Sequence, residues 1–315
     1  MIVSVCNPFQ IKAFRGAFHI REQKNDVVDS VIIANYLRAF GNKSTSLPDE
    51  KLLSLKQLTR FRANLVNNVS ALKNQVLSIL DKVFPEFPSL FLDAFGETAK
   101  QLLLSAPTPN EILKMSSKKL LSLVSKASNG RFKQETVDKL VSAAKGSFGI
   151  KIMSAACSFE IKQIINQMIF IENQIAELDT EIKSLYDSFD CHLTSIPGIG
   201  YVLAPVILAE IGDITRFDSP KKLVAFAGID PSENQSGNRL SSNEQLSKRG
   251  SPFLRHALFT AAFVAMSNDE HLRGFYLRKK AEGKHHYVAM AGLQRKLLSI
   301  IWGVLNEQRP FLPYK

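Results

Sequence analysis

Two long helices are predicted from the spacing of apolar residues along the chain. From Leu58 to Val83 apolar residues recur at steps of three and four, and from Ile161 to Phe189 these steps alternate, which is typical of a coiled-coil seam. The segment between them is punctuated by proline and otherwise helical in pattern. We predict an antiparallel coiled coil of residues 46–84 and 155–189, with a helical insertion at residues 85–154.

The beginning of the chain has a different pattern. The run from Ile2 to Cys6 reads as a short buried strand, and a helical pattern follows from Val28 to Phe40 and stops at Gly41. A lone strand leaves both of its edges unpaired. Residues 1–45 are therefore interpreted as the last part of an α/β domain.

Residues 190–315 form a third region, which is predicted to be helical. Ser195–Gly200 is a tight, glycine-bearing turn, and the polar stretch Ser232–Gly250 reads as a loop. A basic segment, Arg273–His286, separates the last two helices. The chain as a whole is expected to be mostly α. Helices in this region are predicted at about Val202–Ile211, Ser219–Ala227, Pro252–Met266 and Tyr287–Leu305.

The composition excludes several classes of protein. Hydrophobic residues make up 45% of the chain and charged residues 22%, which excludes wholesale disorder. The clean apolar stretch at Ala257–Met266 is too short for a membrane span, and the N-terminus has no basic lead of a signal peptide. Three widely spaced cysteines fit a reducing compartment. We expect a cytoplasmic protein with no membrane partner.

Positive charge is concentrated near the end of the chain. The net charge is +11, and Arg239–Lys315 contains thirteen basic residues against five acidic ones. Lysine and arginine that neutralise phosphates release condensed counterions, so a polyanion such as nucleic acid is the natural partner. A basic surface that only keeps the protein soluble is the alternative.

One acidic pair could bind a metal ion. Asp26 and Asp29 lie three residues apart at the start of a predicted helix, so their carboxylates share one face and could hold a divalent cation with water completing its shell. Two carboxylates are too few for a two-metal site. Aspartate near a helix N-terminus also has a purely structural explanation as a cap.

The sequence Ile196-Pro-Gly-Ile-Gly200 predicts the hairpin of a helix-hairpin-helix element. Glycines let a backbone approach a phosphate closely, and the following helix N-terminus offers free N–H groups. The alternative is a corner that needs glycine only for its bend. The basic residues downstream favour nucleic acid. The predicted phosphate-binding residues are Pro197, Gly198, Gly200, Lys248, Arg249, Arg255, Lys279, Lys280 and Lys284.

Ser236 is a candidate nucleophile in the polar loop. It precedes Gly237, and Ser241, Ser242 and Ser247 lie nearby, followed by two basic residues that could polarise a phosphate. Serines in such loops are also common turn formers. Spacing alone leaves both explanations open.

Taken together, these motifs resemble a known family. The segments Val5–Phe14 and Lys24–Ser30 resemble the end of the RuvC-like domain of DEDD insertion-sequence transposases. This group has a second, serine-bearing C-terminal domain and is related to Piv-type DNA invertases and bridge-RNA-guided recombinases. The C-terminal motifs follow the family's order: Ile196–Gly200, Ala209–Asp213, Arg216-Phe217, Ala225–Gly228, Pro231, Gln235–Gly237, Ser247–Gly250 and Leu254-Arg255.

The resemblance implies specific roles. Residues 1–45 would be the C-terminal remnant of an RNase-H-like domain in which Asp26 and Asp29 bind Mg²⁺. Ser236 would attack the DNA phosphodiester, with Ser247 as the second choice, in a composite site between the two domains, contributed by different protomers. Expected partners are DNA, a structured guide RNA, and copies of the chain that form a dimer or tetramer through the coiled coil. The resemblance also implies a bacterial, nucleoid-associated protein.

The sequence departs from the family at its beginning. The family's first Asp and its Glu have no counterpart among these residues, and the Lys-Thr-Asp form before the third acid is Lys24-Asn25-Asp26 here. We therefore expect an N-terminally truncated transposase that is impaired in strand transfer. A non-catalytic, oligomerising nucleic-acid-binding remnant is the alternative.

Overall fold

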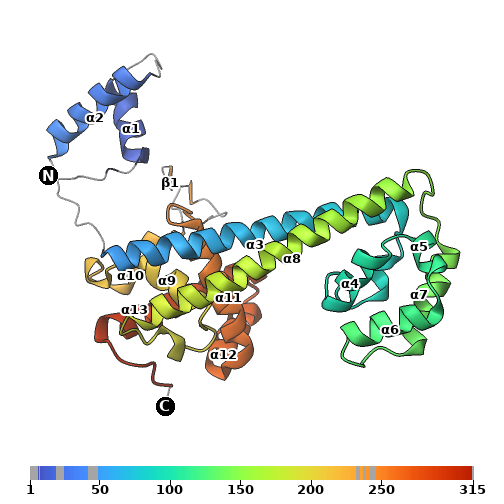
Figure 1. Ribbon diagram of the computed structural model, residues 1–315. Coiled ribbons are helices and arrows are strands. Elements are labelled where there is room, and N and C mark those ends of the chain that lie inside the picture. The colour runs from blue at the N-terminus through green and yellow to red at the C-terminus, as the bar shows by residue number, and fades with distance from the viewer. Residues whose placement is uncertain are drawn as a thin grey trace. The chain divides into compact units, whose positions relative to one another are not determined.

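The computed structural model describes residues 6, 8–18, 25–41, 49–231, 235–236, 239–240 and 246–313. These residues are mainly helical (Figure 1), which confirms the prediction of a mostly α fold. The chain divides into two compact units, Met1–Glu50 and Lys51–Lys315. The strand predicted at residues 2–6 lies outside the described residues, apart from Cys6.

The first unit contains two helices, α1 (Pro8–Phe18) and α2 (Asp26–Phe40). The side chain of Asn25 caps α2 by accepting a hydrogen bond from a backbone N–H of the first turn, at 2.8 Å. The ring of Phe14 packs edge-on against Tyr36, with 5.5 Å between centroids. Aromatic packing therefore joins α1 to α2.

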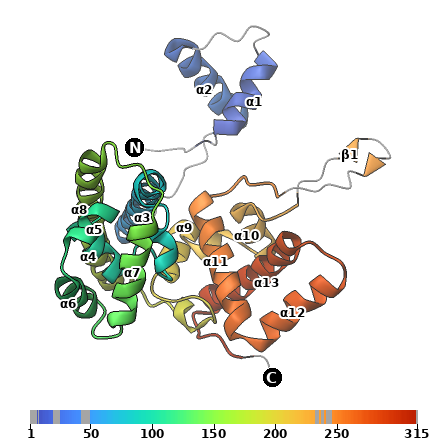
Figure 2. The same cartoon turned by 90° about the vertical axis from the view of Figure 1, so that its right-hand side faces the viewer.

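The second unit is built on two long helices, α3 (Glu50–Val83) and α8 (Ser154–Asp187), which run side by side in opposite directions (Figures 1 and 2). The Arg62 guanidinium on α3 donates two hydrogen bonds to the Asp179 carboxylate on α8, one of them 3.1 Å from Nη2 to Oδ2. Buried apolar residues on the two helices include Leu55, Leu65, Val69, Val76, Ile79, Leu80, Ile161, Ile164, Ile165, Met168 and Ile182.

The segment between the long helices has its own apolar core, packed against one end of α3 and α8. Gly149 crosses the C-terminal end of α3 so closely that a Cβ would lie 2.2 Å from the carbonyl oxygen of Val83. A side chain at position 149 would push this crossing away from the helix. The helices of the segment are η1 (Phe87–Leu90), α4 (Glu97–Ser105), α5 (Pro109–Lys114), α6 (Ser117–Ala127) and α7 (Gln134–Gly146).

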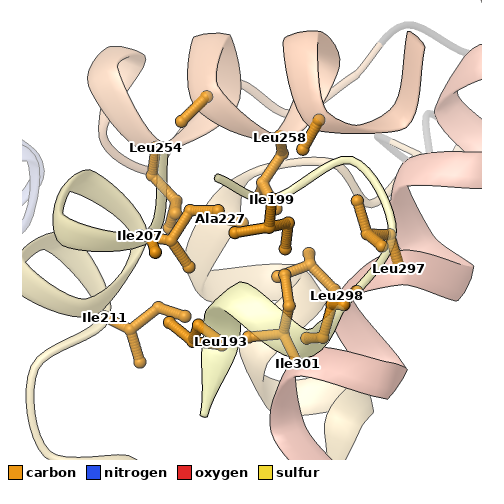
Figure 3. Close-up of a cluster of buried hydrophobic side chains, with 14 of the residues drawn as sticks. Leu193, Ile199, Ile207, Ile211, Ala227, Leu254, Leu258, Leu297, Leu298 and Ile301 are labelled. Atoms are coloured by element: carbon orange, nitrogen blue, oxygen red, sulfur yellow. The ribbon is translucent and has the colours of Figure 1, made fainter. Parts of the chain in front are cut away.

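The C-terminal region packs around the other end of the long helices. Figure 3 shows its centre, where buried side chains of α9, α11 and α13 meet. The elements are η2 (Leu193–Ser195), α9 (Leu203–Ile211), η3 (Ile214–Arg216), α10 (Pro220–Ala227), β1 (Gln235–Ser236), β2 (Arg239–Leu240), α11 (Pro252–Asn268), α12 (Glu270–Ala281) and α13 (His286–Glu307).

Among the described residues, helix α13 is long and apolar enough by composition to cross a membrane, but 56% of its apolar window is buried inside the fold. Leu293, Leu297, Leu298 and Ile301 are fully buried there. Its apolar character is therefore explained by its place in the protein core.

Two features of this region refine the prediction. Helix α8 ends at Asp187, so the regular structure directly before the glycine turn is the single 3₁₀ turn η2 rather than a full helix. The basic segment is itself helical over most of its length, because it contains α12, which begins at the N-cap Asp269. Its charges therefore lie on a rigid element.

Candidate nucleic-acid interface and serine loop

The glycine turn at residues 196–200 is seated on α11. Gly198 has a φ of 86°, and a Cβ there would lie 2.5 Å from the carbonyl oxygen of Ala261 and 2.6 Å from the backbone nitrogen of Ala265. Ile199 next to it is buried. Gly198 is therefore required for packing within the protein.

Gly200 differs from Gly198 although both belong to the same motif. Gly200 is exposed, and a Cβ there would meet no atom within 4 Å. Its carbonyl oxygen accepts hydrogen bonds from the first residues of α9, at 3.0 Å from Leu203 and 2.9 Å from Ala204. Pro197 is half-buried. Of the three predicted phosphate-binding residues in the turn, Gly200 is the most exposed.

The ends of the serine loop are clamped together by two glycines. Gly228 ends α10 with a φ of 68°, and a Cβ there would lie 2.8 Å from the backbone nitrogens of Arg249 and Gly250. A Cβ on Gly250 would lie 2.0 Å from the carbonyl oxygen of Phe226. The two chain segments that frame the loop therefore cross in contact, backbone on backbone.

Hydrogen bonds complete the clamp. The backbone N–H of Ser247 donates to the carbonyl oxygen of Asp230 at 3.0 Å, and its hydroxyl donates to the Asp230 carboxylate. The adjacent residues Pro231 and Leu246 pair in an isolated antiparallel β-bridge. The hydroxyl of Ser247 is thus engaged in holding the base of the loop.

Ser236 lies on the loop that this clamp supports. Its backbone belongs to β1, which pairs antiparallel with β2, and Ser236 is opposite Arg239 in the register. Gly237 lies outside the described residues. The loop therefore carries Ser236 away from the clamp on a short hairpin, with a basic residue at the paired position.

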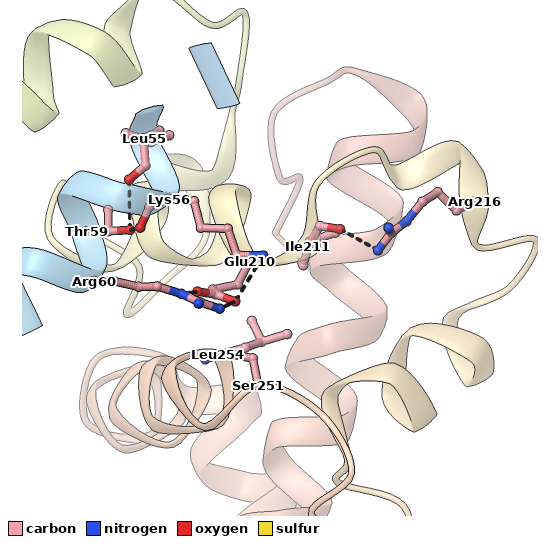
Figure 4. Close-up of polar contacts among 9 residues, drawn as sticks. All are labelled: Leu55, Lys56, Thr59, Arg60, Glu210, Ile211, Arg216, Ser251 and Leu254. Atoms are coloured by element: carbon pink, nitrogen blue, oxygen red, sulfur yellow. Dashed lines mark hydrogen bonds and ion pairs between the residues drawn. The ribbon is translucent and has the colours of Figure 1, made fainter. Parts of the chain in front are cut away.

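The buried carboxylate of Glu210 lies close to Ser251, which directly follows Gly250 of the clamp (Figure 4). Glu210 on α9 is 2% exposed and accepts hydrogen bonds from the Arg60 guanidinium at 2.6 and 3.0 Å, while the Lys56 ammonium lies 3.6 Å away. Burial alone would raise the pKa of Glu210, but the hydrogen bonds from Arg60 and Ser251 and the charge of Lys56 hold it below its usual value. Glu210 thus links α3 and α9 to the N-cap of α11.

Glu210 lies within the motif Ala209–Asp213, but residue spacing in the sequence does not predict that it forms a buried ion pair. The available signal was a single charged residue near the end of an otherwise apolar helix, Leu203–Ile211. Such a residue is buried only if it has partners. Its partner Arg60 lies 150 residues away in the chain, so the pair could not be found from local pattern.

Three predicted basic residues lie at or next to the clamp. Lys248 and Arg249 are exposed, and Lys248 has a φ of 52° and donates its backbone N–H to Gly228 at 3.1 Å. The Arg255 guanidinium, in contrast, donates to the carbonyl oxygen of Gly250. Lys248 and Arg249 present positive charge to solvent, while Arg255 stabilises the clamp.

The other three predicted basic residues lie at the end of α12 and just beyond it. The Lys279 ammonium bonds the Glu282 carboxylate at 2.9 and 3.0 Å, and Lys280 donates to the carbonyl oxygen of Lys284 at 3.1 Å. Lys284 is exposed. These residues form a second basic area, in which Glu282 offsets one positive charge.

Asp26 and Asp29 both lie in the first turn of α2, in the first unit. Asp26 is exposed, and the Asp29 carboxylate accepts a hydrogen bond from Arg15 on α1. Mg²⁺ is commonly bound by one or two carboxylates together with water and substrate phosphates, and this pair fits that pattern. Within the described residues no group of three or more His, Cys, Asp or Glu side chains converges. Arg15 would compete with a cation for Asp29.

Comparisons with known proteins find similar families. A family model described as "Transposase IS116/IS110/IS902 family" matches residues 191–277, and a DEDD transposase model of the IS110 type matches residues 2–85. Over these two regions the chain is similar to the IS110/IS116 family of transposases. The two matches cover both the acidic pair and the region that contains the glycine turn and the serine loop.

Similar proteins agree with this family. An insertion element IS110 protein of 43.6 kDa from Streptomyces coelicolor is 25% identical over 291 residues, which cover 91% of this chain and 71% of that protein. The putative transposase of the IS117 mini-circle from the same species is 26% identical over 333 residues, covering 99% and 79%. A pilin gene-inverting protein from Moraxella bovis is 35% identical over 120 residues, covering 38% and 37%.

The chain is thus similar to insertion-sequence transposases over both matched regions and to a pilin gene-inverting protein over part of its length. The DEDD type of its first domain indicates dependence on a divalent metal.

Proposed function

We propose that this protein cuts and rejoins DNA through a covalent bond to Ser236. The observation that carries the proposal is the clamp formed by Gly228, Asp230, Ser247 and Gly250, which supports a polar loop bearing that serine. Functional residues commonly lie on loops that a rigid scaffold positions. The loop also lies within the region that matches the transposase family.

The clamp favours Ser236 over Ser247 as the nucleophile. A nucleophilic hydroxyl must be free to reach phosphorus. The Ser247 hydroxyl donates its hydrogen bond to Asp230 at the base of the loop. Ser236 is on the projecting hairpin, beside Arg239 in the register. Arginine is a residue type that can stabilise the charge that develops on a phosphate oxygen.

The proposed step is a transesterification. A bond forms between Oγ of Ser236 and phosphorus, and the bond from phosphorus to one deoxyribose oxygen breaks. The serine proton passes to solvent or a nearby base, and the departing strand takes up a proton as a free hydroxyl. The reverse step, with a hydroxyl from a new strand, rejoins DNA and releases the serine.

Asp26 and Asp29 are the residues that we propose hold Mg²⁺. Their carboxylates share one turn of α2, and other ligands would come from water and phosphate oxygens. A bound Mg²⁺ would supply neutralisation of phosphate charge. Asn25 and the N-terminus of α2 fix both aspartates in place.

Nucleic-acid binding is proposed for the exposed parts of the second unit. Gly200, Lys248 and Arg249 offer an approachable backbone and two solvent-facing cations. We further propose that a structured guide RNA binds the basic C-terminal region. We also propose that copies of the chain assemble through the coiled coil of α3 and α8. The guide-RNA proposal is supported by the family resemblance and by the positive charge of the chain, and the assembly proposal by the family resemblance.

Trapping of a protein–DNA adduct tests the proposed function. Purified full-length chain is incubated with Mg²⁺, plasmid DNA that carries the gene and its flanks, and RNA transcribed from those flanks, and then run on a denaturing gel. Wild type and Ser247→Ala should give a covalent adduct, whereas Ser236→Ala should reduce it at least a hundredfold while still binding DNA. An adduct that persists in Ser236→Ala would refute the serine assignment.

The absence of any adduct from wild type would favour the second candidate, a non-catalytic protein that binds nucleic acid. The observation behind this alternative is the hydrogen bond of Arg15 to Asp29, which places a cation where a metal ion would bind.

A further inference from the structure

An open cavity lies beside the base of the serine loop. It has a volume of about 470 Å³ and is lined by residues of α10, α12 and α13, together with Asp230 and Pro231 from the loop base. This volume is within the range of about 300–1,000 Å³ that is usual for small-molecule sites. Whatever occupies it would touch the loop that carries Ser236.

The cavity is positively charged. Lys221, Arg295 and Lys296 line it, against the single carboxylate of Asp230, which already accepts the hydrogen bond from Ser247. Among the described residues, neither Lys221 nor Arg295 forms an ion pair with a carboxylate. A bound anion would therefore gain two cations that have no acidic partner in the described part of the fold.

Lys296 adds to this charge from a confined position. Its ammonium lies 2.9 Å from Nε2 of His271 and 5.2 Å from the centre of the Phe275 ring. Burial, together with the positive charge of Arg278, lowers the pKa of Lys296. Several cationic groups thus lie close together around one opening. A bound phosphate group would reduce the repulsion between their charges.

The rest of the lining is apolar and includes an aromatic ring. Phe275 of α12, Val224 of α10 and Pro231 contribute carbon surface. Gly292 of α13 leaves space beside the Phe275 ring, because a Cβ there would lie 3.5 Å from the ring edge. An aromatic ring beside basic groups is the combination with which proteins hold unpaired nucleotides, by stacking and by phosphate contact.

We propose that this cavity binds one unpaired nucleotide of the DNA strand that is presented to Ser236. The phosphate would bind Lys221, Arg295 and Lys296, and the base would pack against Phe275. The proposal rests on the proposed function, because the position of the cavity at the loop base is the reason to assign it the DNA strand. An unpaired nucleotide held there would fix the position of the neighbouring phosphodiester relative to the loop.

Salt-dependent binding tests the phosphate contacts. Binding of the full chain to a fluorescein-labelled 12-nucleotide oligothymidine is measured by fluorescence anisotropy at several NaCl concentrations. Because each phosphate contact on a single strand contributes about 0.7 to the slope of log K against log salt, Arg295→Gln with Lys296→Gln should lower that slope by about 1.4. Lys222→Gln is the matched control, since Lys222 pairs with Asp218 and does not line the cavity.

An abasic strand tests the base contact. Wild type should bind oligothymidine about fivefold or more tightly than an abasic strand of equal length, and Phe275→Leu should remove most of that difference. Lys221→Gln, at an exposed position, provides a further variant that leaves the core untouched. Thermal unfolding checks that each variant is folded.

The outcomes separate the two proposals. Wild-type binding with an unchanged salt slope in Arg295→Gln/Lys296→Gln overturns the cavity assignment and leaves the function of Ser236 standing. A slope change seen with oligouridine but not with oligothymidine also overturns it, because the occupant would then be RNA. Failure of wild type to bind any strand would contradict both proposals.

Discussion

At the scale of single residues, Gly198 and Gly200 have different roles although they share one motif. Gly198 is pressed onto the backbone of α11, whereas Gly200 faces open space. The motif alone predicts that another group approaches the backbone closely, but it does not predict whether that group is a phosphate or another part of the protein. The distinction depends on Ala261 and Ala265, more than sixty residues away in the chain, and was therefore beyond reach of the sequence.

Substitution of these glycines separates stability from binding. Gly198→Ala should destabilise the protein by about 2–4 kcal/mol, because a positive φ and an overlap with backbone atoms add their costs. Gly200→Ala should change stability little and weaken DNA binding instead. Urea denaturation and DNA-binding titrations measure both, and equal stability of the two variants would contradict the assigned roles.

The buried ion pair of Glu210 predicts a pH-dependent effect. Arg60→Met should cost roughly 3 kcal/mol at pH 7, because it leaves a buried carboxylate without its main partner. The pKa of Glu210 is depressed in the native fold, so the stability that it contributes is present above its unfolded pKa of about 4.3 and is lost as the pH falls through the native value. The cost of Arg60→Met should therefore shrink as the pH falls below about 4.

The matched control for this experiment is two residues away on α3. Arg62 pairs with Asp179, whose side chain is 40% exposed, so Arg62→Met should cost less than about 1 kcal/mol. Urea denaturation at pH 7 and at about pH 3 provides the comparison. A cost for Arg60→Met that is no larger than for Arg62→Met, or that does not change with pH, would count against the role of Glu210.

At the scale of elements, the contact between α1 and α2 controls the acidic pair. Arg15 on α1 neutralises Asp29, so Arg15→Gln should strengthen binding of Mn²⁺, used as a probe for Mg²⁺, by severalfold. Lys12→Gln removes an equal charge from an exposed position on the same helix and should have a smaller effect. Mn²⁺ titration followed by electron paramagnetic resonance measures both variants. Equal affinities in both would show that Arg15 does not compete for the site.

Helical elements could be predicted from the sequence more fully than their contacts. The three–four spacing marks the apolar face of α8, on which Ile161, Ile164, Met168 and Ile182 are buried, because this periodicity is a local property. The basic segment lacks this three–four spacing of apolar residues. Its helix α12 follows the N-cap Asp269, which lies outside the segment predicted to be basic. The clamp of the serine loop joins segments that are distant in the chain, so local patterns could not predict it.

At the scale of the whole molecule, the excess of positive charge and the acidic pair lie in different units. The excess of positive charge lies in the C-terminal region, where Lys248 and Arg249 face solvent beside the clamp and Lys221, Arg295 and Lys296 line the nearby cavity. The acidic pair belongs to the other unit. We therefore expect DNA to bind mainly through the second unit, and this binding should weaken steeply with salt.

Mapping of the DNA-linked peptide tests most directly whether Ser236 is the nucleophile. The adduct is digested with nuclease and trypsin, and the nucleotide-bearing peptide is identified by mass spectrometry. Cleavage after Lys222, Arg239 and Lys248 would place Ser236 in peptide 223–239 and Ser247 in peptide 240–248. We expect the nucleotide on Ser236, within peptide 223–239. A nucleotide on peptide 240–248, or on any other residue, would contradict this expectation.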